Sequence, residues 1–152
     1  MANVNVDYIV IGGGTGGLRA SLACANKGKT VLFEPGTLGG TCLNTGCIPT
    51  KAMLHAAHVC ESSKDSAQFG VTNKTTLNFP KLMNRVRGIV KTGHDHIVIS
   101  VAKYVKAKKL IHVAKPAYFV DKNTVRAGNT TYKAKKILIC TGAKNFVPPI
   151  KG

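Results

Sequence analysis

A six-residue run that is almost all glycine, Gly12 to Gly17, constrains the fold of this chain more than any other feature. It follows directly after a nearly continuous apolar run, Val4–Ile11, which is typical of a buried strand in a parallel sheet. The glycines fit the spacing Gly-x-Gly-x-x-Gly. In that pattern Gly12 permits a tight turn, Gly14 lets the backbone approach a pyrophosphate, and Gly17 lets a helix pack on the strand. We therefore expect a strand, a turn and a helix that ends near Lys27.

A second short strand, Thr30–Phe33, is expected next, and it ends at Glu34. A carboxylate at this spacing accepts hydrogen bonds from an adenosine ribose and would repel a 2′-phosphate. The helix N-terminus would hold the pyrophosphate. The alternative for Glu34 is a surface acid at a strand end. The combination predicts a dinucleotide-binding α/β domain, but spacing alone does not separate FAD from NAD.

Two cysteines, Cys42 and Cys47, flank a short segment that contains Asn44 and Gly46, and both of these tolerate tight turns. The sulfurs can therefore meet without strain. Pro49 suits the first turn of a helix, so Cys47 is expected at a helix N-terminus, where N–H groups and the dipole favour a thiolate. So small a ring would stabilise the fold by only about 2 kcal/mol. A reversible dithiol–disulfide pair is the favoured interpretation, and an ordinary loop with two buried thiols is the alternative.

The segment from Leu38 to Lys51 resembles the redox-active motif of the class I flavoprotein disulfide reductases, which include dihydrolipoamide dehydrogenase, glutathione reductase and mercuric reductase. The matching positions are Gly39, Gly40, Thr41, Cys42, Asn44, Gly46, Cys47, Pro49 and Lys51. The resemblance extends over essentially the whole chain and implies that the dinucleotide is FAD. It also implies that Cys47 is the charge-transfer thiolate nearer the flavin and that Cys42 exchanges with substrate.

The same resemblance implies the remaining contacts to the cofactor. Lys51 would lie beside the flavin ring and stabilise negative charge on it, and the backbone near Ala117 would lie against the adenine. Ile137–Gly142, expected as a last buried strand and turn, resembles the Ala-Thr-Gly motif that passes close to the flavin nucleotide. The expected cofactor-binding residues are Gly12, Gly14, Thr15, Gly17, Glu34, Gly40, Thr41, Lys51, Ala117, Thr141 and Gly142. No metal site is expected.

The other elements complete an α/β fold. We expect a helix after Pro49 that packs through Met53, Leu54, Ala57 and Val59, and a surface loop from Phe69 to Asn78. A long helix should begin at Phe79–Pro80, bury a stripe of Leu82, Val86, Ile89 and Val90, and end in the basic segment Lys103–Lys109. Further strands are expected at Leu110–Val113 and, as an antiparallel β-meander, near Ala117–Asp121, Thr124–Ala127 and Thr130–Lys133.

The fold class is therefore a Rossmann-like FAD-binding domain: a parallel sheet with flanking helices and an antiparallel β-meander. Residues 1–152 are interpreted as the first segment of that domain, truncated relative to the family, with the NAD(P)-binding and dimerisation domains absent. A full-length parent would pass electrons from NAD(P)H to FAD, then to Cys42–Cys47, then to a disulfide or other small redox substrate, and would be a homodimer. Missing domains or a complementary chain are possible partners.

Leu43 and Ile48 favour dihydrolipoamide dehydrogenase within the family. The Glu34–Thr37 link and the ending Val147–Ile150 are as typical of mercuric reductase, so a mercuric reductase-like fragment is the alternative. An inactive reductase remnant and a basic polyanion binder also stay open.

Composition bounds these functions further. The chain has 22 Lys and Arg against 6 Asp and Glu, a formal charge of +16, which would attract polyanions weakly and without specificity. No nucleic-acid-binding motif is present, so no specific nucleic-acid partner is expected. Five cysteines, an odd number, fit a reducing compartment. We find no signal peptide or membrane span, and expect a cytoplasmic protein without a membrane partner.

Overall fold

The computed structural model describes residues 2–144 and 146–151. The chain forms two compact units. The first combines residues 1–36 with 104–152, and the second is residues 37–103.

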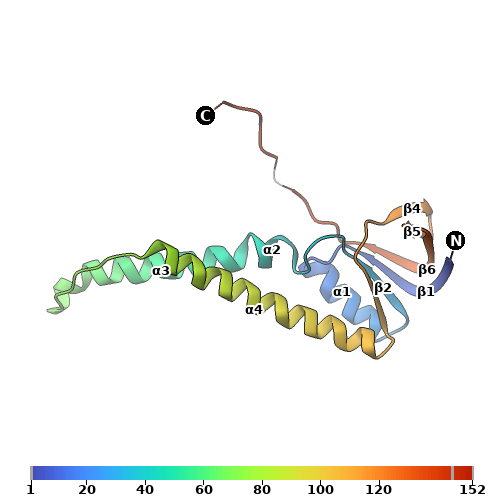
Figure 1. Cartoon of the computed structure of the whole chain (residues 1–152), viewed down its shortest axis with the longest axis horizontal. Helices are drawn as coiled ribbons and strands as arrows, with labels where there is room; N and C mark the ends of the chain where they lie inside the picture. Colours follow the sequence, from blue (N-terminus) through green and yellow to red (C-terminus); the bar gives the residue numbers. More distant parts are fainter. Residues whose placement is uncertain (1, 145, 152) are drawn as a thin grey trace. The chain divides into compact units, whose positions relative to one another are not determined.

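The first unit is built on a six-stranded sheet in the order β3-β2-β1-β6-β5-β4. The strands are β1 (Ala2–Ile11), β2 (Thr30–Phe33), β3 (Leu110–Val113), β4 (Tyr118–Asp121), β5 (Thr124–Ala127) and β6 (Thr130–Ile139). The pairs β3–β2, β2–β1 and β1–β6 are parallel, whereas β6–β5 and β5–β4 are antiparallel. Helix α1 (Thr15–Ala25) lies beside the sheet (Figure 1). This confirms the predicted α/β fold with its parallel sheet and antiparallel meander.

The core of this unit lies on both sides of the central strands. Ile9, Val31 and Phe33 are fully buried on one side, where the ring of Phe33 meets Tyr132 edge to face at 5.1 Å. Burial of such side chains contributes about 1.5–3 kcal/mol each. The all-buried strand β2 agrees with a parallel strand covered on both faces.

One predicted boundary in the sheet is wrong. The third meander strand and the last buried strand were expected as separate elements, but they form the single ten-residue strand β6. Its first half pairs with β5 and its whole length pairs with β1. The second half is also less buried than predicted, since Lys136 is exposed and Ile139 is 66% exposed.

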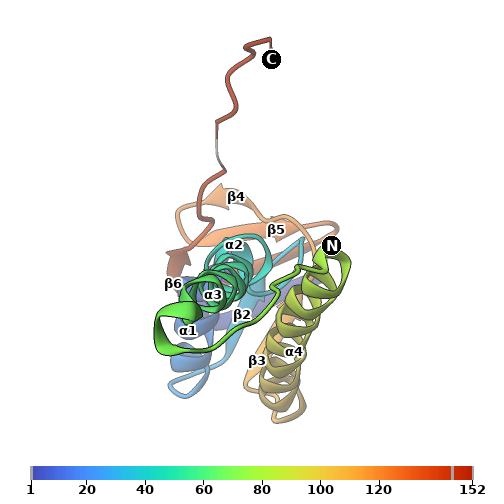
Figure 2. The ribbon, with the colours of Figure 1, turned by 90° about the vertical axis from the view of Figure 1, so that its left-hand side faces the viewer.

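The second unit is helical. It contains α2 (Gly40–Asn44), α3 (Cys47–Lys64), the 3-10 helix η1 (Asp65–Phe69) and most of α4 (Phe79–Lys106), whose last turn belongs to the first unit. Figure 2 shows the segment between η1 and α4 turning the chain back from α3 to α4. The predicted long helix is therefore confirmed. It runs unbroken through Gly93 and the β-branched residues at 97–99.

Gly93 has a packing role. A Cβ at this position would lie 2.7 Å from Cδ1 of Leu43, so the absence of a side chain lets Leu43 of α2 pack closely on α4. Leu43 is only 8% exposed, and Val86 of α4 is 3% exposed. These contacts join α2 to α4.

Two expectations for this unit are wrong. The segment between the cysteines was expected as a loop, but its first two residues, Leu43 and Asn44, belong to the short helix α2, and only Thr45 and Gly46 lie outside a helix. The predicted packing residues of α3 are not buried: Met53, Leu54 and Val59 are 37%, 52% and 57% exposed. Indeed none of the described residues of α3 is buried. Within its unit, α3 has too few neighbours to cover its apolar side chains.

Side-chain hydrogen bonds order the turn between α3 and α4. Asn73 Nδ2 donates to the carbonyl of Ser63 at 2.9 Å and to Oγ of Ser66 at 2.6 Å, and Thr75 Oγ1 lies 2.9 Å from Ser63 Oγ. This network explains why a polar segment without regular structure holds one path. Among the described residues, no helix is long and apolar enough to cross a membrane.

Candidate functional site

The glycine turn after β1 is packed against the end of β6. Gly12 has φ +105°, and a Cβ there would lie 2.2 Å from the carbonyl oxygen of Cys140 and 3.1 Å from Cα of Thr141. The Gly12 N–H donates to the carbonyl of Phe33 at 2.8 Å, and the Cys140 N–H donates to Ile11 at 2.7 Å. Only glycine satisfies both the backbone angle and the space, as the motif predicts.

Helix α1 rests directly on this turn. A Cβ at Gly17 would lie 1.7 Å from the carbonyl oxygen of Gly12, so glycine is required for the contact. Gly14 is the N-cap and makes no side-chain cap, and the first turn of α1 carries no acidic residue. The N–H groups at this end are therefore not neutralised by a side chain, which suits an anionic group such as a pyrophosphate.

Glu34 is fixed at the carboxyl end of β2. Its Oε2 accepts a hydrogen bond from the N–H of Gly13 at 2.6 Å, and its Oε1 accepts one from the N–H of Gly36 at 2.7 Å. The carboxylate is half-buried. Each oxygen keeps a further acceptor site, so Glu34 can also take hydroxyl donors from a ribose.

The first unit thus brings several predicted cofactor residues to one edge of the sheet. Gly12 and Thr141 are in close approach there, and Glu34 joins them through Gly13. Gly142, with φ +67°, follows Thr141, and both are exposed. Thr15 is the exposed first residue of α1.

Ala117 lies just before β4 and is half-buried against the hydrophobic core of this unit. Its role in holding the adenine stays a prediction.

The cysteine segment belongs to the second unit. Cys42 is half-buried on α2, and Cys47 is the exposed first residue of α3, as predicted from Pro49. Gly39 and Gly40 have φ +105° and +59°, the conformations that favour glycine. Together they turn the chain into α2.

Asn44 and Gly46 fix the turn that joins the end of α2 to the start of α3. Asn44 Nδ2 donates to the carbonyls of Leu38 at 3.2 Å and Gly40 at 3.0 Å. A Cβ at Gly46 would lie 2.9 Å from the carbonyl oxygen of Thr41. The segment between the cysteines is thus a packed turn with defined hydrogen bonds. The disulfide pairing itself stays a prediction.

Lys51 is exposed on α3. It lies in the second turn of this helix, which begins at Cys47.

Sequence reasoning missed two participants in the glycine turn. Gly13 donates its backbone N–H to Glu34, and the carbonyl of Cys140 closes the space beside Gly12. The three consecutive glycines at 12–14 could have indicated the hydrogen bond from Gly13, because a glycine between two glycines can turn its N–H toward a neighbouring acceptor. Nothing in the sequence indicated a backbone contact from Cys140.

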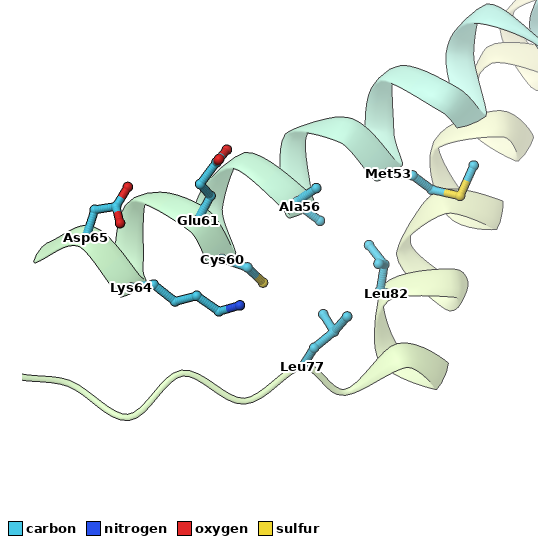
Figure 3. Close-up of a pocket in the computed structure, with 9 residues that line it drawn as sticks. Met53, Ala56, Cys60, Glu61, Lys64, Asp65, Leu77 and Leu82 are labelled. Carbon is cyan, nitrogen blue, oxygen red and sulfur yellow. The ribbon is translucent and has the colours of Figure 1, made fainter.

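Two of the clefts within the second unit are lined partly by residues of α3. One, of about 700 Å³, lies between α3 and the start of α4. Figure 3 shows the thiol of Cys60 and the side chain of Lys64 directed into it beside Met53, Leu77 and Leu82. It contains none of the predicted site residues. The other, of about 380 Å³, is lined by Asn44, Pro49, Met83, Val86, Arg87, Val90, Lys91 and His94.

Within the part of the chain that the structure describes, no three His, Cys, Asp or Glu side chains lie together as metal ligands.

Comparison with known proteins agrees with this geometry. Residues 6–152 match the family model of the pyridine nucleotide-disulphide oxidoreductases. Dihydrolipoyl dehydrogenase of Geobacillus stearothermophilus is 37% identical over 96% of this chain and 32% of its own length. The mitochondrial dihydrolipoyl dehydrogenase of Caenorhabditis elegans is 39% identical over 97% of this chain and 30% of its own.

A solved structure is also similar. The Cu(II) complex of the HOCl-induced flavoprotein disulfide reductase RclA from Escherichia coli superposes with a TM-score of 0.76 at 26% identity, covering 95% of this chain and 29% of that one. The chain thus spans about a third of the length of the relatives it matches. FAD, the cofactor expected from the sequence, is the cofactor of these proteins. With a family model matched over residues 6–152, the chain belongs to the pyridine nucleotide-disulphide oxidoreductases.

Proposed function

We propose that this chain holds FAD and carries the redox-active cysteine pair of an NAD(P)H-dependent disulfide reductase. The observation that carries the proposal is the packed glycine turn, in which Gly12 and Gly17 leave no room for a side chain and Glu34 is fixed beside them. When bound, FAD supplies the two-electron relay between NAD(P)H and the cysteines. Gly14 and the N-terminus of α1 would hold its pyrophosphate, and Glu34 its ribose.

The remaining predicted residues complete the proposed site. Thr141 and Gly142 would contact the flavin nucleotide, and Ala117 the adenine. From the second unit, Gly40, Thr41 and Lys51 would face the flavin. These assignments rest on the family motif.

The chemistry at the cysteines is thiol–disulfide exchange. As a thiolate, Cys42 attacks one sulfur of a disulfide substrate, whose S–S bond breaks as a mixed disulfide forms and the first thiol leaves with a proton from solvent. Cys47 then attacks the sulfur of Cys42 and releases the second thiol. The substrate gains two electrons and the cysteine pair becomes a disulfide. Cys47 is the exposed first residue of α3, so its sulfur is accessible for the second step.

The finer assignments are part of the same proposal. The named dihydrolipoyl dehydrogenases support a dihydrolipoamide dehydrogenase-like parent over a mercuric reductase-like one. The NAD(P)-binding and dimerisation regions would lie outside these 152 residues, on the same or a complementary chain, and the complete enzyme would be a homodimer in the cytoplasm. By itself the chain should bind FAD weakly and should not turn over NAD(P)H, because no second glycine motif is present to seat a nicotinamide.

The test is a titration of the purified chain with FAD, followed by flavin fluorescence, alongside a thiol count before and after mild reduction. We expect saturable binding that survives high salt, and two additional thiols after reduction, mapped by mass spectrometry to Cys42 and Cys47. Absence of saturable FAD binding would refute the cofactor role. Alkylation of both cysteines in air-oxidised protein, without reductant, would refute the redox role.

A further inference from the structure

The smaller cleft of the second unit runs along the segment that carries the cysteine pair. Asn44 and Pro49 form one wall, and each is two residues from a cysteine. The opposite wall is α4. Neither sulfur lines the cleft, so it can receive only the part of a bound molecule that extends beyond a reacting disulfide. Its volume of about 380 Å³ is enough for a small organic group.

The α4 side of the cleft combines apolar and basic residues. Met83, Val86 and Val90 are the apolar lining residues, and Arg87, Lys91 and His94 are the basic ones. No acidic residue is among the lining residues. A molecule that fits here combines an apolar body with a negative group.

The basic residues of the α4 wall differ in whether an acidic residue already pairs with them. Lys91 is paired with Asp95 at 2.6 Å. That contact, with the positive charge of Lys91 and the nearby His94 and His96, holds the pKa of Asp95 below its ordinary value, so Asp95 stays ionised and offsets Lys91. Arg87 contacts only an amide, the Oδ1 of Asn84 at 3.2 Å, and makes no ion pair with any described residue. Among the described residues that line this cleft, Arg87 is therefore a guanidinium without an ion-pair partner.

We infer that this cleft selects disulfide substrates that carry a carboxylate or another anionic group on an apolar body, with Arg87 as the residue that recognises the anion and His94 as a second donor. The inference rests on the proposed function, because it assigns the substrate class of the same cysteine pair. The inference predicts that the cysteine pair reacts faster with anionic disulfides than with neutral disulfides of similar size. An Arg–carboxylate contact can be bidentate, which fixes the orientation of the substrate as well as its charge.

The experiment compares two chromogenic disulfides on the reduced chain. One is 5,5′-dithiobis(2-nitrobenzoate), which carries two carboxylates, and the other is neutral 4,4′-dithiodipyridine. Stopped-flow absorbance gives the rate constants near physiological ionic strength, where charges more than about 8 Å apart in solvent are largely screened. Mass spectrometry assigns the reaction to Cys42 and Cys47, and Cys24, Cys60 and Cys140 are changed to serine to remove other thiols.

The informative variant is Arg87→Gln, and its matched control is Arg85→Gln, which removes the same charge from an exposed position on α4 that does not line the cleft. We expect Arg87→Gln to slow the anionic probe roughly fivefold, about 1 kcal/mol as measured for modest charge pairs, and to leave the neutral probe within about twofold. Arg85→Gln should leave the ratio of the two rates unchanged. His94→Gln should lower the ratio less than Arg87→Gln does.

Equal effects of Arg85→Gln and Arg87→Gln on the ratio of the two rates would show that the ratio depends only on net charge. That result would overturn the inference but would leave the proposed redox role of Cys42 and Cys47 unaffected. An unchanged ratio in Arg87→Gln would do the same. If neither probe reacts with Cys42 or Cys47, the proposed redox function fails as well. A second measurement avoids the reaction altogether: amide NMR shifts of Asn44, Val90 and His94 should move on addition of 2-nitrobenzoate and not of 2-nitrobenzamide.

Discussion

The backbone N–H of Gly13 donates a hydrogen bond of 2.6 Å to Oε2 of Glu34, which joins the turn after β1 to the end of β2. The two residues are 21 positions apart in the chain. Through this bond the carboxylate fixes the path of the glycine turn before any ligand contacts it. Glu34 thus has a structural role as well as the predicted role toward a ribose.

Replacing Glu34 with glutamine should weaken nucleotide binding. The amide side chain can accept one of the two backbone hydrogen bonds, but it loses the charge, and a hydrogen bond to a charged group is worth about 1.5–3 kcal/mol. We expect the Kd for ADP, used as the adenosine half of FAD, to rise roughly tenfold or more. Calorimetric titration measures it. Glu61→Gln, an exposed acid on α3, is the control, and an equal loss in both variants would contradict a local role.

Gly17 and Gly16 form a matched pair on α1. A Cβ at Gly17 would lie 1.7 Å from the carbonyl oxygen of Gly12, whereas a Cβ at Gly16 meets nothing within 4 Å. Gly17→Ala should therefore lower the free energy of unfolding by about 3 kcal/mol or more, because the backbone of the glycine turn must move to make room for the methyl group. Gly16→Ala should be neutral or slightly stabilising. Urea denaturation of both variants checks this, and similar midpoints would show that α1 does not rest on the turn.

Gly93 and Gly88 give the corresponding test on α4. Gly88 faces open space, so Gly88→Ala should stabilise the helix by about 0.5–1 kcal/mol. The free energy of unfolding of Gly93→Ala should be at least about 1 kcal/mol lower than that of Gly88→Ala, because the new methyl group displaces Leu43. Adding Leu43→Val, which shortens that side chain, should recover part of the difference. Additive effects in this double-mutant cycle would argue against the contact.

Asp7 should make the stability of the first unit depend on pH. Hydrogen bonds from the Lys135 ammonium and from the Lys29 backbone N–H lower the pKa of Asp7 from its ordinary value of 3.8. Its contribution is therefore present above 3.8 and is lost as pH falls through the lower folded pKa. We expect Asp7→Asn to lower Tm at neutral pH and the difference from wild type to disappear in acid. A difference that is constant down to pH 2 would exclude titration of Asp7 as its source.

The sequence predicted those elements whose signals are local. The bounds of Thr30–Phe33 and Leu110–Val113 agree with the structure, because both are short apolar runs between clear breaks. Cys47 at the start of a helix follows from Pro49 two positions later. The glycine spacing at 12, 14 and 17 was sufficient to predict the strand, turn and helix in order.

The errors arise where neighbours distant in sequence decide the outcome. Separate strands were expected near Thr130–Lys133 and from Ile137, yet pairing with β1 carries β6 through the residues between them, and Lys135 pairs with Asp7 at 2.7 Å. Met53 and Leu54 have the spacing of a buried helix face, but burial depends on what else is available to cover them. The periodicity of apolar residues can be found in a single sequence, but the number of neighbouring elements that pack on a helix cannot.

The pairing of β1 with β6 joins Ala2 to Thr130 and Ile11 to Ile139, so this central ladder of the sheet connects residues 128 positions apart in the sequence. During synthesis, β1 emerges before β6, and all the residues between them must be made before this pairing can form. The helical segment 37–103 emerges in between and can form its local hydrogen bonds meanwhile. Closing so long a loop is entropically costly and slows folding. We therefore expect the β1–β6 ladder, and with it the nucleotide-binding edge, to form after the cysteine pair already lies within its helices.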